Sequence, residues 1–247
     1  MLRRLTLVLL VLVCAAGVIA FQASRPNATS AAANVFVPDP SVYLQFSPSF
    51  RTSIADAYYL GMVQYFGEHI EGDRKLDALP QMVDLVTALS PHFTRAYLFG
   101  AFALVDAGRP DLGYAVLERG FEANPNDYRF PAYLGYFALT FGDEKTKDAL
   151  AASWYEKAAA VPGRPDYIPR LAATLLGKGG DLEKSVVLWG QVYLAGNEYT
   201  RQRAVDGLEQ ILPTDKDKRM QALAPLALTM PENDFNALIA DLFAGYE

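Results

Sequence analysis

The sequence predicts an all-α protein organised as a solenoid of about four antiparallel helical hairpins. From about Ser49 onward, apolar residues recur every three to four positions, as they do in amphipathic helices. Glycine, proline and asparagine interrupt this pattern at intervals that allow helices of about 14–17 residues. Strand-like alternation of apolar and polar residues is absent from the sequence. Because short turns bring consecutive helices side by side, the expected unit is an antiparallel helical hairpin.

Residues 1–21 are typical of a membrane helix. The stretch from Leu5 to Phe21 contains no charged residue, and Arg3 and Arg4 precede it. These arginines favour a cytoplasmic N-terminus, which places the body of the chain on the extracytoplasmic side, in the periplasm or at the cell surface. We therefore expect a single-pass signal anchor. The apolar stretch is short for a span, so a cleaved signal peptide, which would leave a secreted protein, is the alternative.

Residues 22–48 are expected to form a flexible linker, because they are rich in Ala, Ser, Asn and Pro and show no helical period. The whole chain has a net charge of −6, although its first 30 residues contain three arginines and no acid. The body is therefore acidic, which does not favour nucleic acid as a partner. The single cysteine, Cys14, excludes an intrachain disulfide and a zinc site built from several cysteines.

Residues 49–197 contain a repeated pattern. Gly61, Gly100 and Gly135 each follow a large apolar residue within an expected first helix of a hairpin. Glycine in a helix interior costs about 1 kcal/mol relative to alanine, so we expect these positions to permit close contact with the partner helix. The expected second helices carry small, large and small residues, in the sets Gly113, Leu117 and Gly120; Ala151, Tyr155 and Ala158; and Ser185, Trp189 and Val192.

With these residues the chain resembles the tetratricopeptide repeat family, whose unit is a 34-residue helix–turn–helix with a closing proline. Pro91 and Pro125 lie 34 residues apart, and the likeness covers four units between Thr52 and Asn197. It departs where the family has a first-helix aromatic residue, at Ala57, Ala96 and Pro131. The resemblance implies a right-handed α-solenoid in which each hairpin covers the apolar face of its neighbour. The segment FRTSIADAYYLGMVQYFG is also similar to the entry helix of membrane-anchored bacterial envelope proteins that carry such repeats.

The C-terminal region, residues 198–247, is expected to form capping helices. The segment YTRQRAVDGLEQILP predicts one amphipathic helix, and the rest predicts two short helices around Pro231. The sequence leaves open whether these helices cap the array or bind a partner.

The resemblance further implies a binding groove lined by the first helices of the hairpins, at positions around their glycines. The predicted groove residues are Tyr58, Met62, Tyr65, Tyr97, Arg129 and Tyr136. Tyrosine combines a wide apolar face with a hydrogen-bonding tip, which suits an extended peptide. Arg129 could bind a carboxylate through two hydrogen bonds.

No catalytic constellation is evident in the sequence. Its two histidines are His69 and His92, and both are expected in turns between helices. Glu68, Glu71 and Asp73 lie near His69, but their spacing is not that of a metal site. Nucleophile-elbow, P-loop and Rossmann motifs are absent. We therefore predict no enzyme activity, no catalytic residue, no metal and no cofactor.

The expected function is that of a membrane-tethered scaffold. It would bind another protein or a peptide on the extracytoplasmic side, as an accessory or assembly factor of an envelope complex, with no nucleic acid or small-molecule substrate as a partner. The alternative is a structural subunit that docks through its C-terminal helices, with Leu226, Leu228 and Phe235, and has no peptide groove. A secreted binding protein, released by signal cleavage, is a further alternative.

Overall fold

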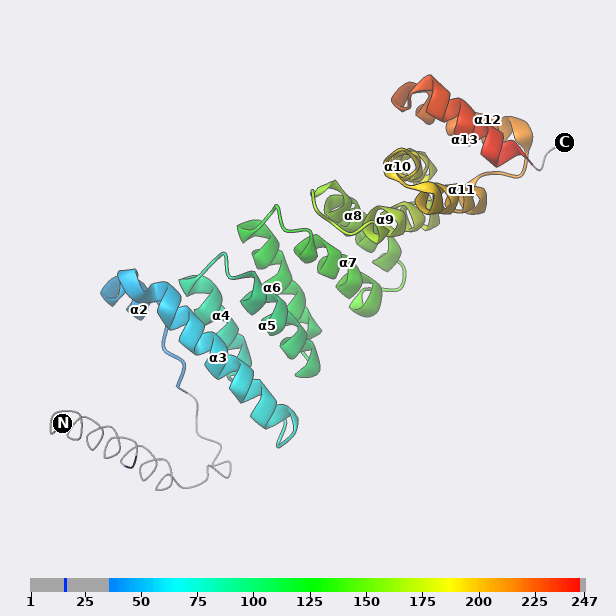
Figure 1. The fold of residues 1–247 in the computed structure, drawn as a ribbon. Coiled ribbons are helices and arrows are strands. Elements are labelled where there is room, and N and C mark those ends of the chain that lie inside the picture. Colours follow the sequence, from blue (N-terminus) through cyan, green and yellow to red (C-terminus); the bar gives the residue numbers. More distant parts are fainter. Residues whose placement is uncertain (1–15, 17–35, 245–247) are drawn as a thin grey trace. The chain divides into compact units, whose positions relative to one another are not determined.

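A computed structural model of the chain describes residue 16 and residues 36–244. The described part contains twelve α-helices and one short 3-10 helix, and no strand is found in it (Figure 1). The predicted all-α fold class is confirmed. The chain divides into two compact units, Met1–Val37 and Pro38–Glu247. All the helices from α2 to α13 belong to the second unit.

The helices from α3 to α10 form four consecutive antiparallel hairpins, as the sequence predicts (Figure 1). They are α3 (Arg51–Ile70) with α4 (Leu79–Leu89), α5 (Thr94–Asp106) with α6 (Pro110–Ala123), α7 (Arg129–Phe141) with α8 (Lys147–Ala160), and α9 (Tyr167–Lys178) with α10 (Leu182–Ala195). The second helix of each hairpin also packs against the first helix of the next one. Each hairpin thereby covers an apolar face that its neighbour cannot cover alone.

Three helices follow the hairpins, in agreement with the expected C-terminal region. They are α11 (Glu198–Ile211), α12 (Lys216–Thr229) and α13 (Glu232–Phe243). Both α11 and α12 pack on α10, and α13 packs on α11 and α12. Leu226 of α12 lies over Gly190 of α10, where an added Cβ would be 2.4 Å from a leucine methyl carbon. The last hairpin is therefore covered by the rest of the chain.

Part of the segment expected as flexible linker is helical, which corrects that expectation for its last residues. Helix α2 (Pro40–Phe46) begins after Asp39, whose side chain accepts a hydrogen bond from the backbone N–H of Ser41. The 3-10 helix η1 (Pro48–Phe50) leads from α2 into α3. A helix of seven residues is too short to show a clear period in the sequence, which is why the pattern missed it. The earlier part of the predicted linker, residues 22–35, lies outside the described residues.

The three first-helix glycines differ in what they contact. An added Cβ at Gly135 would lie 2.7 Å from the ring of Tyr155 on α8, so the expected close approach to the hairpin partner is confirmed there. At Gly100 the nearest atom is a methyl of Val83, at 2.6 Å, on α4 of the preceding hairpin. At Gly61 the nearest atom is 4.0 Å away, which is ordinary van der Waals distance. The expectation of close packing is therefore wrong for Gly61, and wrong about the partner helix for Gly100.

None of the helices that the structure describes is both long enough and apolar enough to cross a bilayer. The predicted membrane segment, residues 5–21, falls outside the described residues except for Ala16.

Candidate functional site

Three of the six predicted groove residues are buried, so the prediction that they line an open groove is wrong. Met62 has no exposed surface, and Tyr97 and Tyr65 are 4% and 8% exposed. Tyr65 donates a hydrogen bond to the backbone oxygen of Lys75 at 2.8 Å and accepts one from the N–H of Ala78 at 3.3 Å. These two bonds hold the long turn between α3 and α4. These three positions face inward in this chain rather than toward solvent.

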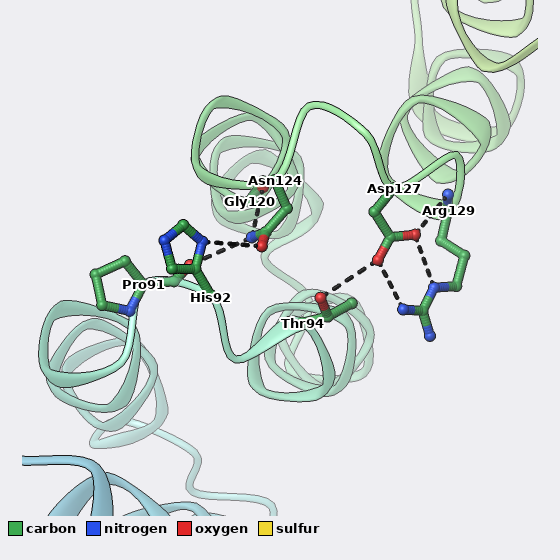
Figure 2. A network of polar contacts seen from close by, with 7 residues as sticks. All are labelled: Pro91, His92, Thr94, Gly120, Asn124, Asp127 and Arg129. Carbon is green, nitrogen blue, oxygen red and sulfur yellow. Dashed lines mark hydrogen bonds and ion pairs between the residues drawn. The ribbon is translucent and has the colours of Figure 1, made fainter. Parts of the chain in front are cut away.

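Arg129 is accessible but already paired (Figure 2). Its Nε and Nη2 atoms donate to the two carboxylate oxygens of Asp127 at 2.8 and 2.6 Å. Thr94 donates to the same carboxylate at 3.3 Å. Burial raises the pKa of Asp127, but the hydrogen bonds from Arg129 and Thr94 outweigh burial, and the pKa lies below its usual value. Asp127 therefore links two hairpins through Thr94, and it also supplies the partner carboxylate of Arg129.

Asn124 connects the same two inter-hairpin turns (Figure 2). Its Nδ2 atom donates to the backbone oxygens of Pro91, at 3.2 Å, and Gly120, at 3.1 Å. Its Oδ1 atom lies 3.2 Å from Nδ1 of His92. Pro91 and His92 follow α4, whereas Asn124 follows α6, so one side chain bridges successive turns. The contact with Asn124 gives His92 a structural role in this turn.

The remaining two predicted residues differ in accessibility. Tyr58 is half-buried, and its hydroxyl lies 2.8 Å from that of Tyr43 on α2. Burial, followed by the hydrogen bond to Tyr43, raises the pKa of Tyr58 to about 12. Tyr136 is 45% exposed and available to a partner. Of the six predicted residues, Tyr136 is therefore the one aromatic residue with an exposed side chain.

The structure reveals a row of partly exposed aromatic side chains where first helices of successive hairpins meet. This aromatic row consists of Tyr59, Phe66, Phe99, Phe102, Tyr133 and Tyr136. Ring centroids of Phe66 and Phe99 lie 5.6 Å apart, and those of Phe102 and Tyr133 lie 5.0 Å apart, both edge-to-face. Such pairs join α3 to α5 and α5 to α7 directly. Because each ring remains partly exposed, the row offers apolar surface in two groups, one around Phe99 and one around Phe102.

Nearer the C-terminus, helices α9 and α11 carry arginine and tyrosine side chains. On α11, Arg203 donates from Nε to the hydroxyl of Tyr199 at 3.2 Å, and its guanidinium lies 5.3 Å from the centre of that ring. This hydrogen bond, together with the nearby charge of Arg170 on α9, lowers the pKa of Tyr199. Tyr199 is 61% exposed. Arg170, Tyr199 and Arg203 form an arginine–tyrosine cluster whose guanidinium groups can donate to carboxylates, and Nη1 of Arg203 already lies 3.7 Å from Oδ2 of Asp206.

Sequence reasoning identified the correct helices but not the correct side of each helix. The segments YYLGMVQYF, YLFGAF and YLGYF each place aromatic residues on both sides of a glycine. Only some of these residues face the surface, and the rotation of each helix within its hairpin decides which. The density of aromatic residues was the available signal, and it did not distinguish Phe99 and Phe102 from Tyr97.

The chemistry available to these surfaces is non-covalent recognition. Exposed rings can pack on apolar side chains, and arginines can pair with carboxylates. Across the described residues, no group of three or more His, Cys, Asp and Glu side chains is placed to hold a metal ion. No family model matches the chain, and a search of curated proteins finds no match.

Proposed function

We propose that the protein is a membrane-tethered scaffold, similar in fold to tetratricopeptide repeat proteins, that binds a segment of another protein without turning over a substrate. Its body would lie on the extracytoplasmic side, anchored through residues 5–21, and would serve an envelope complex as an accessory or assembly factor. The observation that carries this proposal is the aromatic row across α3, α5 and α7. Partly exposed aromatic side chains are the commonest anchors of protein interfaces.

The aromatic row and the arginine–tyrosine cluster define the chemistry of the proposed partner. The aromatic row suits apolar side chains of an extended segment, and the arginine–tyrosine cluster suits acidic residues that follow them. The partner segment would therefore combine an apolar stretch with carboxylates.

The proposal is tested by site-specific photocrosslinking of the full chain in native membranes. A photoreactive phenylalanine at Tyr167, which is 52% exposed and begins α9, the next first helix after the row, should yield a discrete crosslinked protein. Adding Tyr136→Ala should reduce that product by about tenfold or more, because truncating an aromatic anchor removes much of the binding energy. An undiminished product would overturn the assignment of the aromatic row. Tyr97→Ala is unsuitable as a probe, since Tyr97 is buried and its loss would damage the core.

One observation favours the alternative of a structural subunit that docks through its C-terminal helices. Leu228 of α12 is 89% exposed, and Met220, two helical turns earlier, is 40% exposed. Leu226, in contrast, is 1% exposed, and Phe235 packs against the C-terminal core. The same photoreactive residue placed at Leu228 separates the two proposals. A product at Leu228 that is insensitive to Tyr136→Ala, with none at Tyr167, would favour docking through α12.

A further inference from the structure

A cavity of about 330 Å³ lies between two inter-hairpin turns in the second half of the array. One turn connects α8 to α9 and contributes Arg164 and Asp166. The other connects α10 to α11 and contributes Gly196 and Asn197. No residue of the aromatic row or of the arginine–tyrosine cluster lines this cavity, so the site stands apart from the proposed binding surface. Its volume is at the small end of the range for ligand sites, and suits a ligand of about one residue.

Arg164 provides the positive charge of the cavity. Its Nε atom is shielded from solvent and has no hydrogen-bond acceptor within the described part of the chain. The ion pairs found among the described residues do not include Arg164 either. A buried donor without an acceptor is unfavourable and uncommon in folded proteins. The Nε atom is closed to a ligand as it is to water, so a ligand carboxylate would pair with the outer guanidinium nitrogens of Arg164, which form no hydrogen bond or ion pair among the described residues.

Two other polar residues that line the cavity, Asn197 and Asp166, complement the other parts of an amino-acid unit. Asn197 uses its Oδ1 atom to accept from the N–H and hydroxyl of Thr200, at 3.0 and 3.1 Å, which leaves its NH₂ group able to donate to a ligand. Asp166 precedes α9 but makes no capping hydrogen bond with its side chain. Its carboxylate can therefore accept a hydrogen bond from a ligand amino or amide N–H.

The rest of the lining combines the polar residues Gln191 and Thr200 with apolar side chains. Pro169, Leu188, Val192 and Ala195 contribute to the wall. Gly196 has no side chain, and an added Cβ there would lie 2.6 Å from Cβ of Thr200. The cavity thus joins apolar side chains to one cation, one carboxylate, two side-chain amides and one hydroxyl, a set that can contact the carboxylate, the N–H and the aliphatic side chain of an amino-acid unit.

We propose that this cavity binds an α-amino-acid unit with an aliphatic side chain, its carboxylate held by Arg164 and Asn197 and its N–H by Asp166. Two sources share this chemistry. One is a free amino acid such as leucine or valine, and the other is the C-terminal residue of a peptide. The site does not depend on the proposed scaffold function, because its ligand and its lining residues are different.

Calorimetric titration of the full chain, purified in detergent, tests the proposal. The ligands are L-leucine, L-valine, a peptide acetyl-Ala-Ala-Leu with a free carboxylate, and the same peptide as its C-terminal amide. A carboxylate ligand should bind, and the amide should bind at least about tenfold more weakly, because it offers no charge to the guanidinium. Binding of leucine or valine alone identifies a free amino acid as the source, whereas binding of the peptide alone identifies a C-terminus.

Variants of the chain provide the second arm. Arg164→Gln should weaken binding by about tenfold or more while the helical circular dichroism and the melting temperature stay unchanged. Arg109→Gln is the matched control, since Arg109 is exposed and lies outside the cavity. The proposal is overturned if none of the carboxylate ligands binds at millimolar concentration, if the peptide amide binds as tightly as the acid, or if Arg164→Gln binds like the wild type.

Discussion

Two pairs of neighbouring inter-hairpin turns in this array are built in different ways. Between the α4–α5 turn and the α6–α7 turn, the side chains of Asn124 and Asp127 cross the gap and form hydrogen bonds to the earlier turn (Figure 2). Between the α8–α9 turn and the α10–α11 turn, a cavity takes the place of such a bridge. We refer to these as the closed and the open turn pair.

The difference arises at the residue that ends the second helix. Asn124 is the C-cap of α6, and Gly196 is the C-cap of α10. The side-chain amide of asparagine can reach the preceding turn, whereas glycine has no side chain that could form such a bridge. The α10–α11 connection is also very short, since α10 ends at Ala195 and α11 begins at Glu198. A side chain at Gly196 would collide with Thr200, so this tight turn requires glycine and leaves the space open.

The same repeat position thus carries a bridging side chain in one turn pair and none in the other. A side chain that crosses the gap fixes one hairpin against the next. Where it is absent, Arg164 lines the cavity, and its buried Nε atom has no hydrogen-bond partner within the described chain. Three predictions test the closed turn pair, in order of decreasing effect.

The largest effect is expected for Gly120→Ala, at the base of the closed turn pair. An added Cβ would lie 2.2 Å from the ring of Phe130, which is completely buried. The rings and helices must move apart, so the free energy of unfolding should fall by about 2 kcal/mol. Chemical denaturation monitored by circular dichroism measures this change.

Gly61→Ala is the matched control for this substitution. Gly61 also lies within a helix, but the nearest atom to an added Cβ is 4.0 Å away. Alanine should be neutral there or stabilise the protein by up to about 1 kcal/mol, because its helix propensity is higher. Equal stability of the Gly120 and Gly61 variants would contradict the close packing of α6 on α7.

A smaller effect is expected for Asn124→Gly, which gives the closed turn pair the C-cap residue of the open one. The variant loses the hydrogen bonds to Pro91 and Gly120 and the contact with His92. The free energy of unfolding should fall by about 1 kcal/mol in the same denaturation experiment. Asn126→Gly, at an exposed position of the same turn, is the control and should change stability less. A loss no greater than in this control would mean that the bridge does not stabilise the closed pair.

The smallest effect concerns pH and Asp127. Its pKa is lowered in the folded protein, so its contribution is complete above the unfolded pKa, near 4, and is lost as pH falls through the lower folded pKa. Because Arg129 is 43% exposed, solvent screens the pair, and we expect a contribution of about 0.5–1 kcal/mol. The melting temperature should be lower at pH 3 than at pH 7, and this fall should be larger for the wild type than for Asp127→Asn. An identical fall in both proteins would show that the ion pair adds nothing to acid sensitivity.

Individual residues show how far sequence reasoning reached. The helical period predicted the four hairpins, and the small residue at Gly135 marked a real close approach to Tyr155. The burial of Met62 and Tyr97 was not predicted, because both belong to helices whose rotation depends on neighbours distant in sequence. Arg129 carried a charge suited to a ligand, but its pairing with Asp127 depends on a turn conformation that a pattern of residue types does not contain.

By itself, the sequence determined the all-α class and the positions of the hairpins, because helix periodicity and turn residues are local properties of the chain. Only the tertiary structure decided which aromatic residues form the surface row and which turns are bridged or open. Those outcomes depend on how each helix is rotated against its neighbours, and such packing joins residues about one repeat apart. Asn124 and Gly196 look like ordinary turn residues in the sequence, and their different roles become visible only when the preceding turn lies beside them.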